Sequence, residues 1–190
     1  MMKSADNKVD ECDRQLVRKI SEGSKTAFGQ LFFEFYYDLC DFTLSIMHSK
    51  DEARDVVQDV FLRIWKRRSG WEIHTSLKIY MFQAVRNEAL NHIAKKKSLL
   101  RLKREFARAS LTDMEESGRE WNDEERKVVK RIWEIAEEMP EKRQSVFTLH
   151  RKHGLSYKEI SGIMGITRKT VENHMGEALK YIRERMAVEL

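Results

Sequence analysis

The sequence contains a single proline and eight glycines among its 190 residues. Turns depend heavily on these two residue types, so the chain has little of the turn chemistry that a sheet of many strands needs. Charged residues make up 35% of the sequence, and residues that suit solvated helices, such as Lys, Glu, Arg, Leu and Ala, are frequent. We therefore expect an all-α protein.

Cysteine is also scarce, and its placement excludes two further classes of protein. Cys12 and Cys40 are far apart, form no CxxC motif and have no nearby set of histidines at metal-ligand spacing. We expect free thiols in a reducing compartment, and neither a zinc site nor a disulfide framework.

The sequence lacks the usual signs of catalysis. Its six histidines are scattered, and it has no clustered carboxylates, no phosphate-binding loop and no nucleophile paired with a base. We therefore expect no catalytic residues, no metal and no cofactor, and classify the chain as a binding protein rather than an enzyme.

Long apolar runs are missing as well. The N-terminal stretch MMKSADNKVDECDRQ has no apolar signal-peptide core, and no window approaches the ~18 apolar residues that a membrane span needs. We expect a cytoplasmic protein with no direct membrane insertion.

The charge pattern divides the chain. The net charge of +5 is a weak indication of a nucleic-acid partner, but its distribution is uneven. Residues 95–108 carry seven basic side chains against one acidic, whereas residues 112–125 carry seven acidic against one basic. Residues 98–124 also lose the apolar stripe, which predicts a flexible linker between two small helical domains, 10–97 and 125–190.

Apolar spacing in the first domain predicts four helices, over residues 10–21, 25–48, 51–66 and 77–97. The aromatic-rich run FGQLFFEFYYDLC is most simply core. In the third helix, Ala53, Val57, Val60, Phe61 and Ile64 share one face, and another face carries Asp55, Gln58, Asp59 and Leu62. Ser76 or its neighbour Thr75 can cap the fourth helix.

The second domain has clear helix boundaries. After a helix over residues 125–138, Pro140 suits the first turn of another, which Gly154 would follow. Ser156 and Glu159 form an S-x-x-E capping box for the next helix, and Gly165 can end it.

A last helix begins near Arg168, with Thr167 as its cap. Two short helices joined by a glycine-containing turn, with a cationic leading edge on the second, are typical of a helix-turn-helix that reads the major groove of DNA. An ordinary helical hairpin is the simpler alternative, and the capped starts and the cationic edge favour DNA binding.

The segment EEMPEKRQSVFTLHRKHG, followed by LSYKEISGIMGITRKTVENHMGEALKYIRE, resembles domain 4 of extracytoplasmic-function sigma factors over residues 133–186. The resemblance implies that the helix of residues 167–180 reads the minus-thirty-five promoter element and that the domain packs on the flap of the RNA polymerase β subunit. The side chains it implicates in DNA binding are Ser156, Thr167, Arg168, Lys169, Thr170, Glu172, Asn173 and His174.

The segments DEARDVVQDVFLRIWKRR and SLKIYMFQAVRNEALNHIAKKK resemble domain 2 of the same family. In that family the first of these helices binds the coiled coil of the polymerase β′ clamp. The matching polar positions are Asp55, Gln58 and Asp59, with Leu62 adding apolar contact. Phe61 and Trp65 also match, but large rings at helical spacing usually pack inward, and we expect core there.

By the same resemblance, the loop of residues 71–76 and the helix after it separate the DNA strands at the minus-ten element and hold a flipped base. Aromatic stacking and phosphate contacts suit single-stranded DNA. The residues that fit such a surface are Trp71, His74, Tyr80, Arg86, Asn87, Asn91, Lys95 and Lys96. Family members often carry Trp at the position of Tyr80 and Asp at the position of Asn91, so no base preference is implied.

The C-terminal motif also resembles LuxR-type regulators, which leaves an alternative function: a transcriptional regulator that binds operator DNA without core polymerase. A receiver domain would need alternating strands and helices, whereas residues 10–97 read as helical throughout, which favours the sigma factor. The sigma resemblance further implies core RNA polymerase and promoter DNA as partners, together with an inhibitory anti-sigma factor that is often membrane-anchored.

Overall fold

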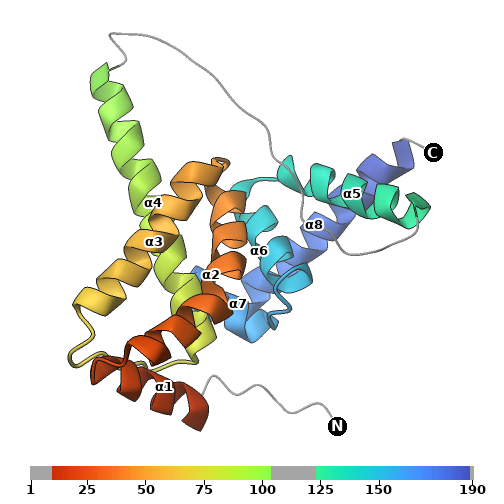
Figure 1. Cartoon of the computed structure of the whole chain (residues 1–190). Helices are drawn as coiled ribbons and strands as arrows, with labels where there is room; N and C mark the ends of the chain where they lie inside the picture. Colours follow the sequence, from red (N-terminus) through yellow and green to blue (C-terminus); the bar gives the residue numbers. More distant parts are fainter. Residues whose placement is uncertain (1–9, 104–122, 189–190) are drawn as a thin grey trace.

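The computed structural model describes residues 10–103 and 123–188, and within these ranges the chain is all-α, as predicted, with eight helices and no strand (Figure 1). The helices are α1 (Glu11–Ser21), α2 (Lys25–Met47), α3 (Lys50–Lys66), α4 (Leu77–Lys103), α5 (Asp123–Glu137), α6 (Glu141–Arg151), α7 (Tyr157–Met164) and α8 (Arg168–Val188).

Helices α1 to α4 form the N-terminal half, in which α2 packs against α1, α3 and α4. Aromatic rings join α2 to α3: the Phe32 and Phe61 ring centroids are 5.0 Å apart, and those of Phe28 and Trp65 are 4.9 Å apart. Phe61 is buried, as predicted, and Trp65 is half-buried. The face of α3 that carries Val57 is likewise buried.

One helix cap in this half comes from far away in the sequence. Ser76 accepts a long hydrogen bond from the backbone N–H of Ile79 at 3.4 Å, which matches the predicted cap. The N–H of Leu77 donates to the Asp13 carboxylate at 2.8 Å, and Asp13 lies on α1. A side chain 64 residues earlier thus helps to start α4 and ties α1 to it.

The C-terminal half, α5 to α8, follows the local signals closely. The capping box of Ser156 and Glu159 is complete at the start of α7, and Gly165 ends that helix with φ of 64°. Thr167 accepts from the N–H of Thr170 at 3.1 Å and so caps α8, as predicted. Pro140 stands at the N-cap of α6, one position before the first turn predicted for it.

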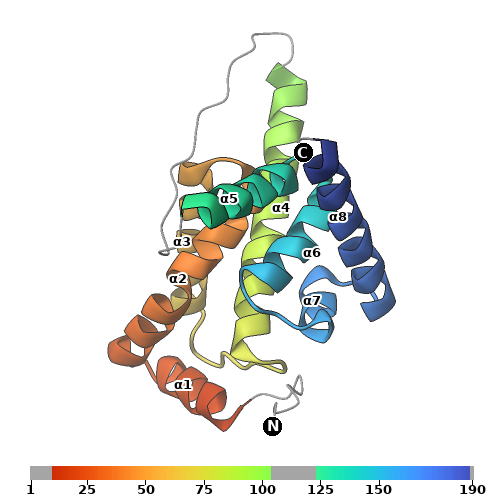
Figure 2. The same cartoon turned by 90° about the vertical axis from the view of Figure 1, so that its right-hand side faces the viewer.

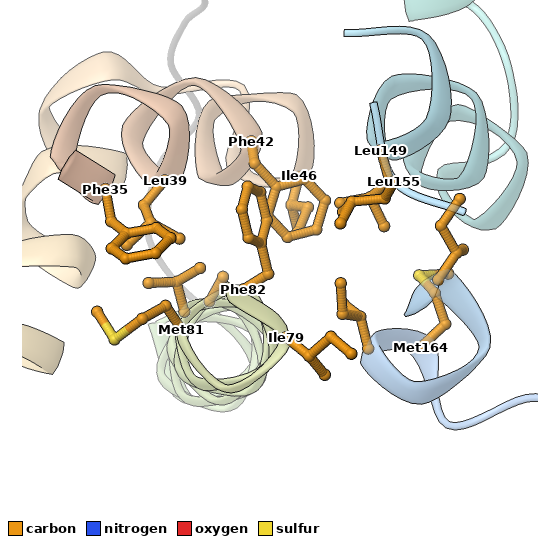
Figure 3. Close-up of a cluster of buried hydrophobic side chains, with 14 of the residues drawn as sticks. Phe35, Leu39, Phe42, Ile46, Ile79, Met81, Phe82, Leu149, Leu155 and Met164 are labelled. Carbon is orange, nitrogen blue, oxygen red and sulfur yellow. The ribbon is translucent and has the colours of Figure 1, made fainter. Parts of the chain in front are cut away.

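The two halves pack against each other. Helix α6 lies against α2, and α7 lies against α4 (Figure 2). Apolar side chains of all four helices and of the turn between α6 and α7 meet in one cluster, labelled in Figure 3, which contains Phe42 and Ile46 of α2, Ile79 and Phe82 of α4, and Leu149, Leu155 and Met164 of the C-terminal half.

The predicted linker is only partly visible. Helix α4 continues to Lys103, six residues beyond the predicted end at Lys97, and α5 begins at Asp123. Residues 104–122, which make up most of the predicted linker, lie outside the described residues. The division into domains at 10–97 and 125–190 therefore stays a prediction.

Candidate nucleic-acid and protein interfaces

The outward face of α3 carries the four residues predicted to bind a protein partner. Asp55, Gln58 and Asp59 are exposed, and Leu62 is 52% exposed. Within the described part of the chain, neither carboxylate has an ion-pair partner. The face thus combines two unneutralised acids, an amide and a large apolar side chain, and suits a partner with both basic and apolar groups.

Two aromatic residues of α2 extend the exposed apolar surface. Phe33 is 79% exposed and Tyr37 is 77% exposed. The Phe32 ring contacts both Phe33, at 6.0 Å, and Phe61 of α3, at 5.0 Å, so Phe33 lies beside the junction of the two helices. The prediction that the whole aromatic run is core was wrong for these two residues, because α2 is apolar on several sides and periodicity cannot tell its outer face from its inner one.

A groove between α3 and α4 brings together four of the residues predicted to contact the minus-ten element. Its cavity of about 320 Å³ is lined by Trp71, Tyr80, Asn87 and Asn91, with the Trp71 and Tyr80 ring centroids 5.6 Å apart. The Trp71 Nε1 is buried and has no hydrogen-bond partner among the described residues. Two aromatic rings can stack on a nucleotide base, and two amides can hydrogen-bond it.

Charged residues that sequence reasoning missed also line this groove. Arg63 Nη2 lies 2.5 Å from Glu88 Oε2, across the space between α3 and α4, and Arg67 lines the cavity as well. The two partners of the ion pair are 25 residues apart, so no motif marks them. Arg63 and Arg67 supply positive charge of the kind that phosphates attract.

The other predicted minus-ten residues lie elsewhere. Arg86 is half-buried. Burial lowers the pKa of its guanidinium, and the charge of Glu141 on α6 opposes this effect only in part. His74 is exposed and does not line the groove, Lys95 is exposed, and Lys96 forms an ion pair with Glu52 of α3. The structure therefore does not gather all eight residues on one surface.

The leading edge of α8 presents the residues predicted to read DNA. Arg168 and Lys169 are exposed, and both pair loosely with Glu172, at 3.2 and 3.7 Å. Asn173 is exposed, and the half-buried His174 lies 3.9 Å from a carboxylate oxygen of Glu177. Because exposed ion pairs of this kind are weak, the two cations can exchange Glu172 for a phosphate or a base edge.

A hollow beside this edge is lined by residues from α6 to α8. It measures about 520 Å³, and its lining residues are His150, Ser156, Tyr157, Lys158 and Arg168. The His150 Nδ1 lies 2.8 Å from the backbone carbonyl oxygen of Leu155, which can only accept, so Nδ1 carries the proton. Sequence reasoning had named Ser156 and Arg168 but missed the other three, because their common hollow depends on the turn between α6 and α7.

Among the described residues, no group of three His, Cys, Asp or Glu side chains is arranged to hold a metal ion. Both cysteines are free thiols, as predicted. No helix in the described ranges is long and apolar enough to cross a membrane.

Comparison with known proteins supplies independent information on both halves. The family model for Sigma-70 region 2 matches residues 33–99, and the model for Sigma-70 region 4 matches residues 130–182. The RNA polymerase sigma-H factor of Pseudomonas aeruginosa is 23% identical over 182 residues, which cover 92% of this chain and 93% of that protein. The RNA polymerase sigma factor CnrH of Cupriavidus metallidurans is 26% identical over 182 residues, covering 89% and 91%.

A solved structure has the same fold. The sigma factor RpoE of Bartonella quintana, in complex with the anti-sigma factor NepR, covers 86% of this chain and 98% of its own with a TM-score of 0.68 at 19% identity. A LuxR-type regulator would leave the region 2 match unexplained. Because regions 2 and 4 follow each other on one chain and coincide with the two halves that carry the candidate surfaces, the chain belongs to the sigma-70 family, as an RNA polymerase sigma factor of the extracytoplasmic-function type.

Proposed function

We propose that this sigma factor recruits core RNA polymerase to promoters through the exposed face of α3, and reads two promoter elements with the α3–α4 groove and the edge of α8. The observation that carries the proposal is the presence of both sigma-70 regions on one chain, each with an exposed polar surface of suitable chemistry. The sigma factor supplies positioning, and the polymerase supplies catalysis.

Core polymerase is assigned to the face of Asp55, Gln58, Asp59 and Leu62. The two unpaired carboxylates attract a basic partner surface, and Leu62 adds desolvated apolar contact at the centre. The exposed ring of Phe33, beside the junction of α2 and α3, can enlarge this apolar area. We assign the β′ clamp to this face and the β flap to the C-terminal half.

The minus-ten element is assigned to the α3–α4 groove. Trp71 and Tyr80 offer stacking surfaces, Asn87 and Asn91 offer donors and acceptors, and Arg63 and Arg67 offer phosphate contacts. His74, Lys95 and Lys96 do not line this groove, and as exposed side chains they can contact the DNA backbone beyond it. Arg86 is left out of the groove, because it is half-buried and does not line the cavity.

The minus-thirty-five element is assigned to α8. Arg168, Lys169 and Asn173 are exposed at the start of a helix with a well-formed N-cap, the usual position for base contacts in a helix-turn-helix. Two weakly binding surfaces on one chain reinforce each other, because binding of the first surface to its element raises the effective concentration of the second surface near its own element. We therefore expect the free protein to bind either element poorly.

An anti-sigma factor is a further proposed partner. The similar RpoE structure was solved in complex with the anti-sigma factor NepR, and it shares the fold of this chain. We propose an inhibitory partner of this class here, and we place its binding and the action of the sigma factor in the cytoplasm, where core polymerase works.

The test is transcription in vitro by bacterial core polymerase on promoter fragments from the host, with and without the protein. We expect start-site-specific transcripts only in its presence. The variant Asp55→Lys should abolish core binding in a pull-down, and Arg168→Ala should leave core binding intact but weaken use of the minus-thirty-five element. Matched controls are Glu11→Lys on α1 and Arg183→Ala near the end of α8, both exposed and outside the assigned surfaces.

If core polymerase never becomes promoter-specific while the protein alone shifts duplex operator DNA, the regulator function replaces this proposal. If transcription is specific but Asp55→Lys behaves like Glu11→Lys, the sigma function stands and the assignment of the α3 face is wrong.

A further inference from the structure

The contact between the two halves is centred on a buried histidine. The side chain of His153, in the turn between α6 and α7, is 2% exposed. Its ring lies against Phe42 of α2 and Phe82 of α4, with centroid distances of 6.2 and 5.1 Å. A residue of the C-terminal half is therefore inserted into the aromatic core of the N-terminal half.

Four polar contacts surround this ring, and each one joins the two halves. Lys152 Nζ donates to Asp41 Oδ1 at 2.6 Å, and Lys78 Nζ donates to the backbone carbonyl oxygen of His153 at 2.9 Å. His153 Nε2 lies 3.4 Å from Asp41 Oδ2, and Nδ1 lies 3.8 Å from an oxygen of Asp38. We call the set of Asp38, Asp41, Lys78, Lys152 and His153 the His153 latch.

The latch is incompletely satisfied. Both ring nitrogens of His153 and the Oδ2 of Asp41 are buried and make no hydrogen bond of good geometry with any described residue. Buried polar atoms without partners favour a return to water, whereas the apolar cluster of Figure 3 favours contact between the halves. The contact between the halves thus receives one favourable and one unfavourable contribution to its free energy. It can therefore hold the chain together and can also open.

The closed arrangement is too small to reach both promoter elements at once. Elements centred near minus ten and minus thirty-five are about 25 base pairs apart, or ~85 Å at ~3.4 Å per base pair. A compact chain of 190 residues has a radius of gyration of about 16 Å, so its diameter is about half of that separation. The groove and the edge of α8 must therefore move apart before both can engage DNA.

We propose that the His153 latch holds the free sigma factor in a closed resting state, and that opening of the latch precedes simultaneous binding of the two promoter elements. The proposal rests on the proposed function of the groove and of α8. Its consequence is quantitative, because the apparent affinity for polymerase and promoter together falls in proportion to the fraction of chains that are open.

Charge reversal at the latch is the direct test. Asp41→Lys places a third cation beside Lys152 and Lys78 and should open the full-length chain. Small-angle scattering should then report a larger radius of gyration, while circular dichroism reports unchanged helix content. With 1–10% of the wild type open, a typical range for a minor state, promoter complexes should form at about 10- to 100-fold lower concentrations of the variant.

A charge swap and a matched control complete the experiment. Asp41→Lys combined with Lys152→Asp restores an ion pair across the halves and should return both readouts toward wild type. Glu11→Lys reverses a carboxylate on the exposed part of α1, away from the latch, and should change neither. If Asp41→Lys loses helix content, the milder Asp41→Asn takes its place in both measurements.

An unchanged radius of gyration in the folded latch variants would show that the latch does not hold the two halves together. A larger radius without any gain in promoter affinity would overturn the resting-state role. Failure of the proposed function is a separate outcome, because it appears in Asp55→Lys and Arg168→Ala and does not affect the scattering measurement.

Discussion

Two regions of the molecule differ in the type of side chain they contain: the core beneath α2, α3 and α4, and the contact between the two halves. Beneath α2, side chains such as Leu31, Leu39 and Met81 are fully buried and wholly apolar. The contact between the halves combines similar apolar groups with a buried imidazole, two carboxylates and two ammonium groups. Rearranging closely packed apolar side chains costs a large amount of free energy, whereas charged groups regain hydration when they separate. The first region is suited to staying together, and the second to coming apart.

The largest effect is expected from the apolar core. Leu39→Ala removes a fully buried side chain of α2 and should lower the free energy of unfolding by about 2–5 kcal/mol. Phe33→Ala removes a larger side chain from the exposed part of the same helix and should cost no more than about 0.5 kcal/mol. Urea unfolding followed by circular dichroism compares the two, and equal losses would show that the α2 faces are wrongly assigned.

A smaller, pH-dependent effect is expected at Asp41. Burial raises the pKa of this carboxyl, but the contacts with His153 and Lys152 together lower it further, so its pKa lies below the ordinary value. A carboxyl with a depressed pKa in the folded state contributes stability above its unfolded pKa, and loses that contribution as the pH falls through the folded value.

Asp41→Asn should therefore destabilise the chain by about 1–2 kcal/mol at neutral pH, and by less below about pH 4. Urea titrations at pH 7 and pH 3 measure the difference, with the exposed Asp59→Asn as control. A deficit that is the same at both pH values would mean that the Asp41 charge contributes nothing to closure.

Removing a helix cap should have a more modest effect on the free energy of unfolding. Two such caps allow a comparison between a cap from a neighbouring residue and a cap from a residue distant in sequence. Ser156→Ala removes the capping box of α7 and should cost about 1 kcal/mol within the C-terminal half. Asp13→Ala removes the cap on α4 and should cost a similar amount, and it should also speed amide exchange throughout α1, which it ties to α4. Exchange that quickens only at Leu77 would show that α1 is held by its apolar contacts alone.

The smallest effect concerns thiol reactivity. Burial raises the pKa of the Cys40 thiol, and this outweighs the opposite influence of Tyr36 and Arg54. Cys12 is exposed on α1. A thiol reagent at neutral pH should therefore label Cys12 several-fold faster than Cys40. Mass spectrometry of tryptic peptides over time measures the ratio, and equal rates would show that α2 opens frequently in the free protein.

Features determined by neighbouring residues could be predicted from the sequence. The capping box at Ser156, the turn at Gly165 and the two faces of α3 depend on spacings of a few residues. The predicted minus-ten set was gathered only in part, because neighbouring positions around one turn of α4 have different surroundings: Asn87 lines the groove, whereas Arg86 is half-buried outside it.

The contacts between the halves could not be predicted from any local sequence pattern. Lys78 and His153 are 75 residues apart in sequence, and Asp41 and Lys152 are 111 apart. By sequence alone, Asp41, Lys78 and Lys152 have the ordinary positions of solvated charges, and His153 that of a turn histidine. Only the packing of α6 and α7 on α2 and α4 brings them together, and hydrophobic periodicity carries no information about which helices will meet.

The exposed rings of Phe33 and Tyr37 also affect how the protein must be handled. Neighbouring aromatic side chains in water promote self-association as concentration rises, and they are attractive targets for chaperones. We therefore expect copies made in excess over polymerase to aggregate or to be degraded more readily than bound copies. In the laboratory, we expect the same two rings to limit the concentration at which the purified protein stays in solution, and a serine at each position is the first change to test for storage.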